Sequence, residues 1–135
     1  MSISVEAYRN LGTTEHQLQV SVVKYVGLYG RKGVRAIAIP NEGKRSNTTG
    51  ARMRDRGLAA GMPDLLIVLP GKLCAWIELK RSKTGRMSVE QKGVHAWLTS
   101  IGHDVCVAYT LDEAIEFLGK VGALRNHRSA TEGTT

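Results

Sequence analysis

The sequence is poor in cysteine, in aromatic residues and in long apolar runs. Its 135 residues include two cysteines, Cys74 and Cys106, which both lie in apolar stretches and so indicate buried reduced thiols. No apolar run reaches the roughly 20 residues of a membrane-spanning helix. The start, MSISVEAYRN, lacks the charged and apolar regions of a signal peptide. These absences predict a cytoplasmic protein without membrane association.

Other classes of site lack their usual motifs. No stretch matches the phosphate-binding loop G-x-x-x-x-G-K-[ST], so we expect no nucleotide cofactor. His103 and Cys106 have an H-x-x-C spacing, and His95 and Cys74 lie elsewhere, but no CxxC or HxxxH pair supports a zinc site. Aromatic residues make up 5% of the chain, which argues against single-strand binding by base stacking.

The sequence is rich in positive charge. The formal net charge of +7 favours a polyanionic partner, nucleic acid above all, but charge alone fits a solvated basic surface equally well. The basic residues gather in two stretches, 44–56 and 80–92, which we expect to hold a DNA backbone with little reading of bases. The predicted DNA-binding residues are Lys44, Arg45, Arg52, Arg54, Arg56, Arg81, Lys83 and Arg86.

Hydrophobic periodicity and turn residues predict an α/β domain with a mixed sheet covered by helices. The first two predicted helices each begin with a capping box, Thr14 with Gln17 and Ser88 with Gln91. Residues 51–61 suit one further short helix. The predicted helices cover 15–29, 88–101 and 111–121, and the predicted strands cover 34–39, 64–69, 73–80 and 103–109. We expect a single domain over residues 1–124 and a polar, basic, disordered tail over 125–135.

Three charged residues stand at the ends of an apolar hairpin over residues 61–80. A two-residue Pro-Gly loop would twist against the strands, so a three-residue loop, 70–72, is favoured. This loop places Asp64 opposite Glu78, with Cβ atoms roughly 4.5–5.5 Å apart, whereas a slip of one residue would separate them. Lys80 lies two residues beyond Glu78 and therefore points to the same face.

Two facing carboxylates repel each other unless a cation lies between them. Asp64 and Glu78 offer the oxygen ligands that suit Mg²⁺, which commonly takes its other ligands from water and phosphate. Lys80 would orient water, lower its pKa or offset phosphate charge. The simpler alternative is that Asp64 caps the strand entrance while Glu78 and Lys80 form a surface ion pair. The opposed acids, the tight entry made by Gly61 and Pro63, and the adjoining basic stretches favour the metal site.

The ordered motifs resemble those of a nuclease family. Pro63-Asp64 followed by Glu78-Leu79-Lys80 has the form PD-(D/E)xK, and the wider set is similar to the VRR-NUC family, the virus-type replication-repair nuclease domain, over residues 14–118. The wider set consists of Glu15 on a helix, Pro40-Asn41-Glu42-Gly43 after a strand, Gly61-Met62-Pro63-Asp64, Glu78-Leu79-Lys80, and Gln91 on the following helix.

The resemblance implies a restriction-endonuclease-like α/β fold with an αβββαβ core, and hydrolysis of DNA phosphodiesters that depends on Mg²⁺ or Mn²⁺. By the same resemblance, Asp64 and Glu78 are metal ligands, the backbone carbonyl of Leu79 is a third ligand, and Lys80 is the catalytic lysine. Short members of the family that stand alone, typical of phages, are homodimers that cut branched DNA such as Holliday junctions. The lack of flap-recognition domains points to this group, and a phage-encoded protein would act in DNA repair in the bacterial cytoplasm.

Two further residues carry both a structural and a functional interpretation. The resemblance makes Glu15 a helical acid that acts through water or on a second metal, whereas position alone makes it an acid that complements the helix dipole. By the same resemblance Gln91 is a polar residue of the site, whereas its position alone makes Gln91 half of a capping box. We favour the site for both. Glu42 is at most an outer-sphere group, and plain turn chemistry is its alternative.

Three other functions stay open at this point. One is a non-catalytic DNA-binding module on the same fold, which the complete Asp, Glu and Lys set disfavours. A second is a sequence-specific restriction endonuclease, for which no segment is large enough to serve as a base-reading insertion. The third is a flap nuclease.

Overall fold

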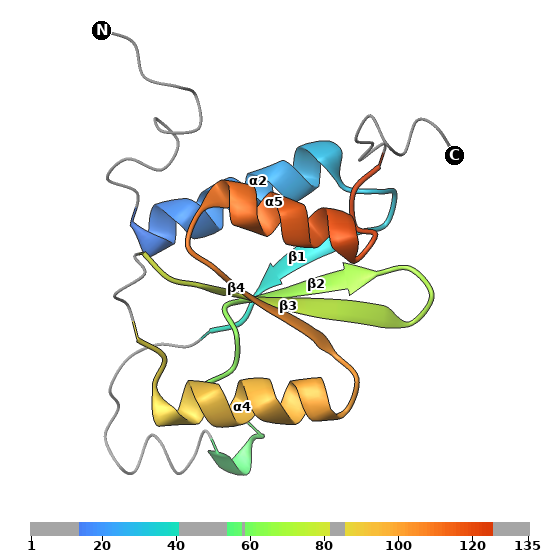
Figure 1. Ribbon diagram of the computed structural model, residues 1–135. Coiled ribbons are helices and arrows are strands. Elements are labelled where there is room, and N and C mark those ends of the chain that lie inside the picture. The colour runs from blue at the N-terminus through green and yellow to red at the C-terminus, as the bar shows by residue number, and fades with distance from the viewer. Residues whose placement is uncertain (1–13, 41–53, 58, 82–85, 126–135) are drawn as a thin grey trace, which may run out of the picture.

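The computed structural model describes residues 14–40, 54–57, 59–81 and 86–125, which form a four-stranded sheet with helices on both faces (Figure 1). The order of elements confirms the predicted helices and strands, with ends that differ by at most one residue. In chain order they are α2 (Glu15–Tyr29), β1 (Arg35–Ala38), β2 (Leu65–Leu69), β3 (Leu73–Leu79), α4 (Val89–Ser100), β4 (Asp104–Ala108) and α5 (Leu111–Lys120).

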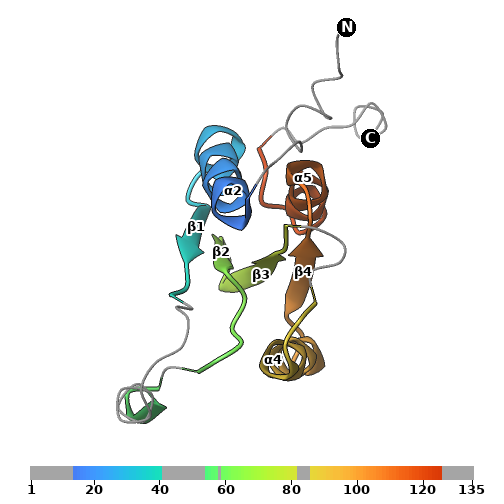
Figure 2. The ribbon, with the colours of Figure 1, turned by 90° about the vertical axis from the view of Figure 1, so that its left-hand side faces the viewer.

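The sheet is mixed, as predicted. Its strands lie in the order β1-β2-β3-β4, with antiparallel pairs up to β3 and with β4 parallel to β3. A parallel pair needs a crossover connection, which α4 provides. The helices α2 and α5 lie on one side of the sheet and α4 lies on the other (Figure 2).

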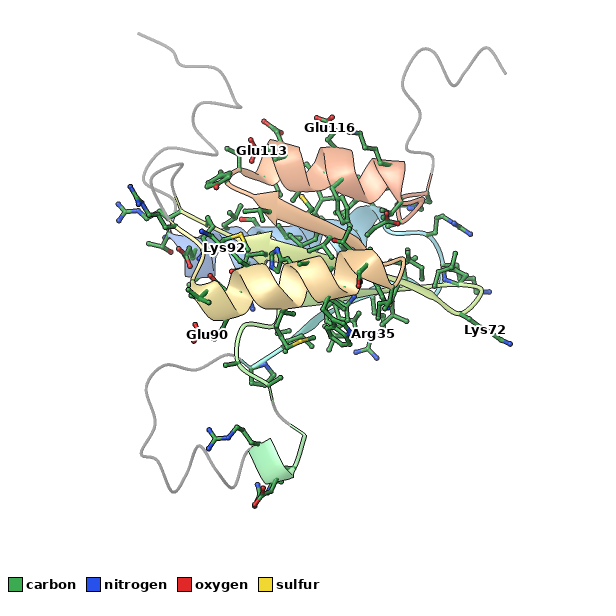
Figure 3. The ribbon with its side chains drawn as sticks, turned by 60° about the horizontal axis from the view of Figure 1, so that its bottom comes forward. Arg35, Lys72, Glu90, Lys92, Glu113 and Glu116 are labelled. Atoms are coloured by element: carbon green, nitrogen blue, oxygen red, sulfur yellow. The ribbon has the colours of Figure 1, made fainter. Side chains whose placement is uncertain are left out.

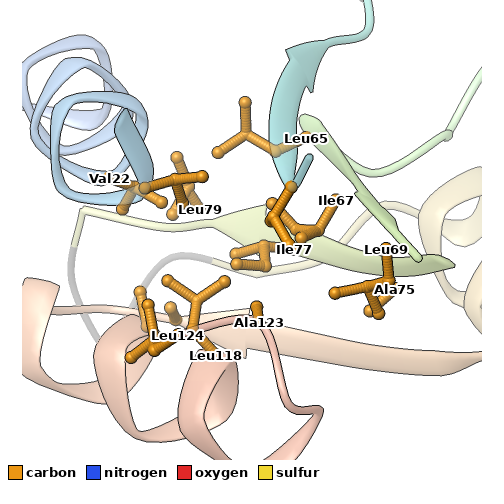
Figure 4. Packing of buried hydrophobic residues seen from close by; sticks show 14 of the residues in the cluster. Val22, Leu65, Ile67, Leu69, Ala75, Ile77, Leu79, Leu118, Ala123 and Leu124 are labelled. Atoms are coloured by element: carbon orange, nitrogen blue, oxygen red, sulfur yellow. The ribbon is translucent and has the colours of Figure 1, made fainter. Parts of the chain in front are cut away.

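The hydrophobic core lies between the sheet and the layer of α2 and α5 (Figure 4). Alternate residues of a strand face opposite sides, and those of β2 and β3 that face this layer are buried except Leu73, beside the hairpin loop, which is exposed. Burial of each large apolar side chain contributes about 1.5–3 kcal/mol to stability. The core includes Leu65, Ile67, Ile77 and Leu79 from the strands, Leu18, Val22 and Val26 from α2, and Ala114 and Leu118 from α5.

The other face of β3 carries Cys74, Trp76 and Glu78, and α4 packs near it. Trp76 Nε1 donates a hydrogen bond to His103 Nδ1 at 3.1 Å. Both cysteines are free thiols, but Cys74 and Cys106 are partly exposed, so the prediction that they are fully buried was wrong. Cys106 lies on β4 and lines an open cavity between β4 and α5, which leaves it partly exposed.

Capping residues fix where α2 and α4 begin. Thr14 Oγ1 accepts from the Gln17 backbone N at 3.0 Å, and Gln17 Oε1 accepts from the Thr14 backbone N at 2.9 Å. Ser88 and Gln91 make the same reciprocal pair at the start of α4, at 3.1 and 2.9 Å. Both predicted capping boxes are confirmed.

Some predictions fall on parts of the chain beyond the described residues. The short helix predicted over 51–61 is described in part: Arg54 and Asp55 form a helical turn, whereas 51–53 and 58 lie outside. Residues 126–135 also lie outside, so the domain boundary at 124 stays a prediction. Within the described ranges, no helix is both long and apolar enough to cross a membrane.

Candidate active site

The hairpin of β2 and β3 brings Asp64 and Glu78 together. The two strands pair in the register Leu65 with Ile77, and a three-residue loop joins them, so both the predicted loop and the predicted register are confirmed. One step further in this register, Asp64 stands opposite Glu78. Asp64 Oδ2 also accepts a hydrogen bond from the Leu79 backbone N at 2.7 Å, which ties the residue before β2 to the end of β3.

A connected polar network surrounds Glu78 beneath α4. Glu78 and Lys80 are both buried, with 2% and 9% of their surfaces exposed. Gln91 joins them, because its Nε2 donates to Glu78 Oε2 at 3.0 Å and its Oε1 accepts from Lys80 Nζ at 3.1 Å. Lys80 Nζ lies 3.9 Å from Glu78 Oε2. Lys80 therefore shares the face of Glu78, as predicted.

Gln91 belongs to the helix cap and to the network at once. Its Oε1 accepts from the Ser88 backbone N as well as from Lys80 Nζ. The capping interpretation and the site interpretation of Gln91 are therefore compatible, since one side chain satisfies both sets of contacts.

The environment of Glu78 disfavours its charged form. Burial first, and then the charge of Asp64, raise the pKa of Glu78 from 4.5 to about 8. A hydrogen bond to Asp64 and the charge of Glu15 add to the rise, while Lys80 opposes it. Glu78 Oε1 is buried and has no hydrogen-bond partner among the described residues. Without a cation, the carboxyl group is mostly protonated at pH 7 and one of its oxygens is unsatisfied.

These observations fit a divalent cation held by Asp64 and Glu78. A cation would offset the repulsion between the two groups and favour the ionised form of Glu78. No cluster of three or more His, Cys, Asp or Glu side chains that could hold a metal occurs in the described part of the chain. Water, phosphate oxygens or the Leu79 carbonyl would therefore complete the ligand set, as is usual for Mg²⁺.

Glu15 reaches the margin of the site from α2. The start of α2 and the end of β3 lie at the same end of the molecule (Figure 1). Glu15 Oε2 accepts a hydrogen bond from the Arg81 backbone N at 3.3 Å, and its charge contributes to the raised pKa of Glu78. Glu15 is exposed and forms no three-acid cluster with Asp64 and Glu78, so a direct bond to the same ion is not part of this arrangement.

Comparison with solved structures identifies the fold. The sequence matches no family model and no curated protein. A solved structure described as a "VRR_NUC domain protein" is 25% identical, with a TM-score of 0.66, over 84% of this chain and 94% of its own. A second, described as a "VRR_NUC domain", is 18% identical, with a TM-score of 0.57, over 80% of this chain and 97% of its own, and supports the fold alone. The chain has the fold of a VRR-NUC domain. The VRR-NUC resemblance and the fold expected from it are thereby confirmed, and the likeness supports a nuclease domain of that family.

One residue that lies near the site, His95, was not predicted as a site residue from the sequence. His95 lies on α4, and its Nε2 is 3.8 Å from Glu78 Oε1. Burial first, and then the charge of Lys80, lower the pKa of His95. The available signal was its position four residues after Gln91, which places both side chains on one face of a helix.

The residues predicted to bind DNA are only partly described. Four of them are described and exposed: Arg54, Arg56, Arg81 and Arg86. Five residues considered above lie outside the described ranges: Glu42, Lys44, Arg45, Arg52 and Lys83. Arg81 adjoins the site of the VRR-NUC domain through its contact with Glu15. Figure 3 shows this end of the molecule, marked by Glu90 and Lys92 on α4, opposite the end that carries Lys72 in the hairpin loop.

Proposed function

We propose that this VRR-NUC domain is a Mg²⁺- or Mn²⁺-dependent DNA endonuclease that hydrolyses phosphodiesters in branched DNA such as Holliday junctions. The observation that carries the proposal is the pairing of buried Glu78 with Asp64, since this arrangement is unfavourable unless a cation binds there. A nuclease domain of this family acting on a polyanion also agrees with the net charge of +7.

Each side chain of the network has a role in this reaction. When bound, a divalent cation supplies Lewis-acid activation of water and offsets charge at the scissile phosphate. Asp64 and Glu78 would hold the cation. Lys80 lies beside them with its Nζ oriented by Gln91, so its positive charge is fixed where negative charge develops on the phosphate. Arg81 adjoins the site and attracts the DNA backbone.

The proposal includes two copies of the chain. A four-way junction has two strands to cut, and a two-fold dimer presents two sites to them. Light scattering at working concentration is expected to show a dimer, and a monomer that resolves junctions would remove this part of the proposal.

A panel of labelled substrates tests the activity. The wild-type protein is expected to cut four-way junctions in Mg²⁺ or Mn²⁺ and to cut nothing in chelator. Cleavage of flaps alone would indicate a flap nuclease instead. Cleavage that depends on base sequence and not on branching would indicate a sequence-specific endonuclease. Absence of cation-dependent cleavage from every substrate would leave a non-catalytic DNA-binding module.

Replacing Asp64 with asparagine separates catalysis from binding. Asp64→Asn keeps an oxygen acceptor for the Leu79 backbone N but removes a charged ligand. We expect cleavage to fall by at least about 100-fold, beyond the effect of most changes outside the ligand set, while salt-dependent junction binding persists. Asp104→Asn, an exposed acid at the far end of β4, is the matched control and should cut normally. Equal cleavage by both variants would refute the role of Asp64.

A further inference from the structure

Two buried polar atoms face each other at the contact between α4 and β3. Glu78 Oε1 and His95 Nε2 are both buried, and neither has a hydrogen-bond partner among the described residues. They lie 3.8 Å apart. Buried polar atoms are almost always paired in folded proteins, so two unpaired atoms this close point to an interaction that forms in a working state of the site.

The distance restricts what joins the two atoms. A hydrogen bond from N–H to O spans about 2.7–3.2 Å, so a shift of less than about 1 Å makes a direct bond. A bridging water would have to contact both atoms from one side at a narrow angle, which is a less favourable geometry than a direct bond. A cation shared by Asp64, Glu78 and His95 is not indicated either, because no three such side chains in the described ranges form a metal-binding cluster.

A second residue of α4 contacts the same carboxyl group. Gln91 and His95 lie four residues apart on the same helix, and Gln91 Nε2 already donates to the other Glu78 oxygen, Oε2, at 3.0 Å. One helix face therefore presents an N–H group to each oxygen of the carboxylate. A carboxylate held at both oxygens has a fixed orientation, and groups that orient a metal ligand in this way commonly change metal affinity by about 10–100-fold.

We infer that His95 is a positioning residue, whose Nε2–H donates to Glu78 Oε1 and holds the ionised carboxylate in the orientation that binds the cation. This inference rests on the proposed cation site. It does not require His95 to be charged, since an imidazole carries a proton on Nε2 in one neutral tautomer as well as in the cation. Gln91 and His95 together then set the direction of the Glu78 lone pairs toward Asp64.

Calorimetric titration with Mn²⁺, without DNA, tests the inference. His95→Leu removes the donor and is expected to weaken Mn²⁺ binding by about 10–100-fold. His95→Gln keeps an N–H group near the same place and should bind within a few-fold of wild type. His103→Leu is the matched control, because His103 contacts Trp76 on the same sheet face, and it should bind Mn²⁺ normally. Thermal unfolding in chelator checks that each variant folds.

The results distinguish hydrogen-bond donation by His95 from a role of its ring in packing alone. Wild-type affinity in His95→Leu, or equal losses in the Leu and Gln variants when both fold, would overturn the inference. Spectra of ¹⁵N-labelled histidine at about pH 9.5, above the pKa of about 8 for Glu78, give a readout that is independent of the metal, because the carboxylate is then ionised without a cation. Donation requires a proton on Nε2, so a tautomer protonated only on Nδ1 under these conditions also overturns the inference. Wild-type protein that binds no Mn²⁺ would defeat the proposed function, while the spectra would still show whether His95 donates to Glu78.

Discussion

Glu78 is the residue at which stability and function conflict. Its carboxyl is buried against Asp64 and under Gln91 and His95, with Lys80 as the nearby positive charge. Because its pKa is higher in the folded chain than in the unfolded one, the folded state binds the proton more tightly. Stability contributed by this proton is fully present below about pH 4.5 and is lost as the pH rises through about 8.

Removing the charge should therefore stabilise the metal-free protein at high pH. Each pKa unit corresponds to about 1.4 kcal/mol, so Glu78→Gln is expected to gain about 4 kcal/mol at pH 8 relative to its effect at pH 4.5. Cleavage should be lost in the same variant. Denaturant unfolding in chelator at the two pH values measures the gain, and an effect of equal size at both would show that the Glu78 pKa is not raised.

At the scale of elements, a glycine sets how closely the entry to β2 approaches α4. Gly61 has a φ of 90°, and a Cβ atom there would lie 2.5 Å from the backbone carbon of Glu90 and 2.8 Å from the Gln91 backbone N. Only a residue without a side chain fits both the backbone conformation and the close contact. The first turn of α4, and with it the Gln91 contact to Glu78, therefore depends on this glycine.

Gly61→Ala should push the start of α4 away from the hairpin. Gly71→Ala is its control, because Gly71 also has a positive φ, of 78°, but has open space around it. We expect the control to lose about 1 kcal/mol from backbone strain. Gly61→Ala should lose more and should also cut DNA more slowly. If Gly61→Ala and Gly71→Ala lost the same free energy of unfolding and cut DNA at the same rate, the close contact between Gly61 and α4 would have no effect on stability or cleavage.

The sequence predicted those elements of the site that depend on residues close together along the chain. The loop of the hairpin determines its register, so the approach of Asp64 to Glu78 followed from the loop length alone. A capping box is set within four residues, which made the start of α4 predictable from Ser88 and Gln91. His95 was missed because its contact depends on how α4 packs across β3. Its position four residues after Gln91 places it on the same helix face, but does not show which strand that face meets.

At the scale of the whole molecule, cation binding should stabilise the fold. A ligand that binds only the folded state adds about 2.7 kcal/mol at 100 times its dissociation constant. Because Glu78 must lose a proton to bind the cation, apparent affinity should fall about tenfold for each pH unit below about 8. Mn²⁺ should therefore raise the melting temperature clearly at pH 8 and much less at pH 6.

Thermal unfolding at both pH values, with and without chelator, measures this linkage. Asp64→Asn is the control and should show little response to Mn²⁺ at either pH. A shift in melting temperature that is the same at pH 6 and pH 8 would contradict proton release from Glu78.

Because Gln91 both caps α4 and contacts Glu78 and Lys80, local unfolding of the helix end affects the site. Helix ends open and close far more often than whole domains unfold. Each time the first turn of α4 frays, the amide leaves Glu78 and Lys80 together with Ser88. Mild heat or denaturant should thus break the Gln91 contacts before the core unfolds, so that the proposed cleavage of DNA would be lost at a lower temperature than the fold.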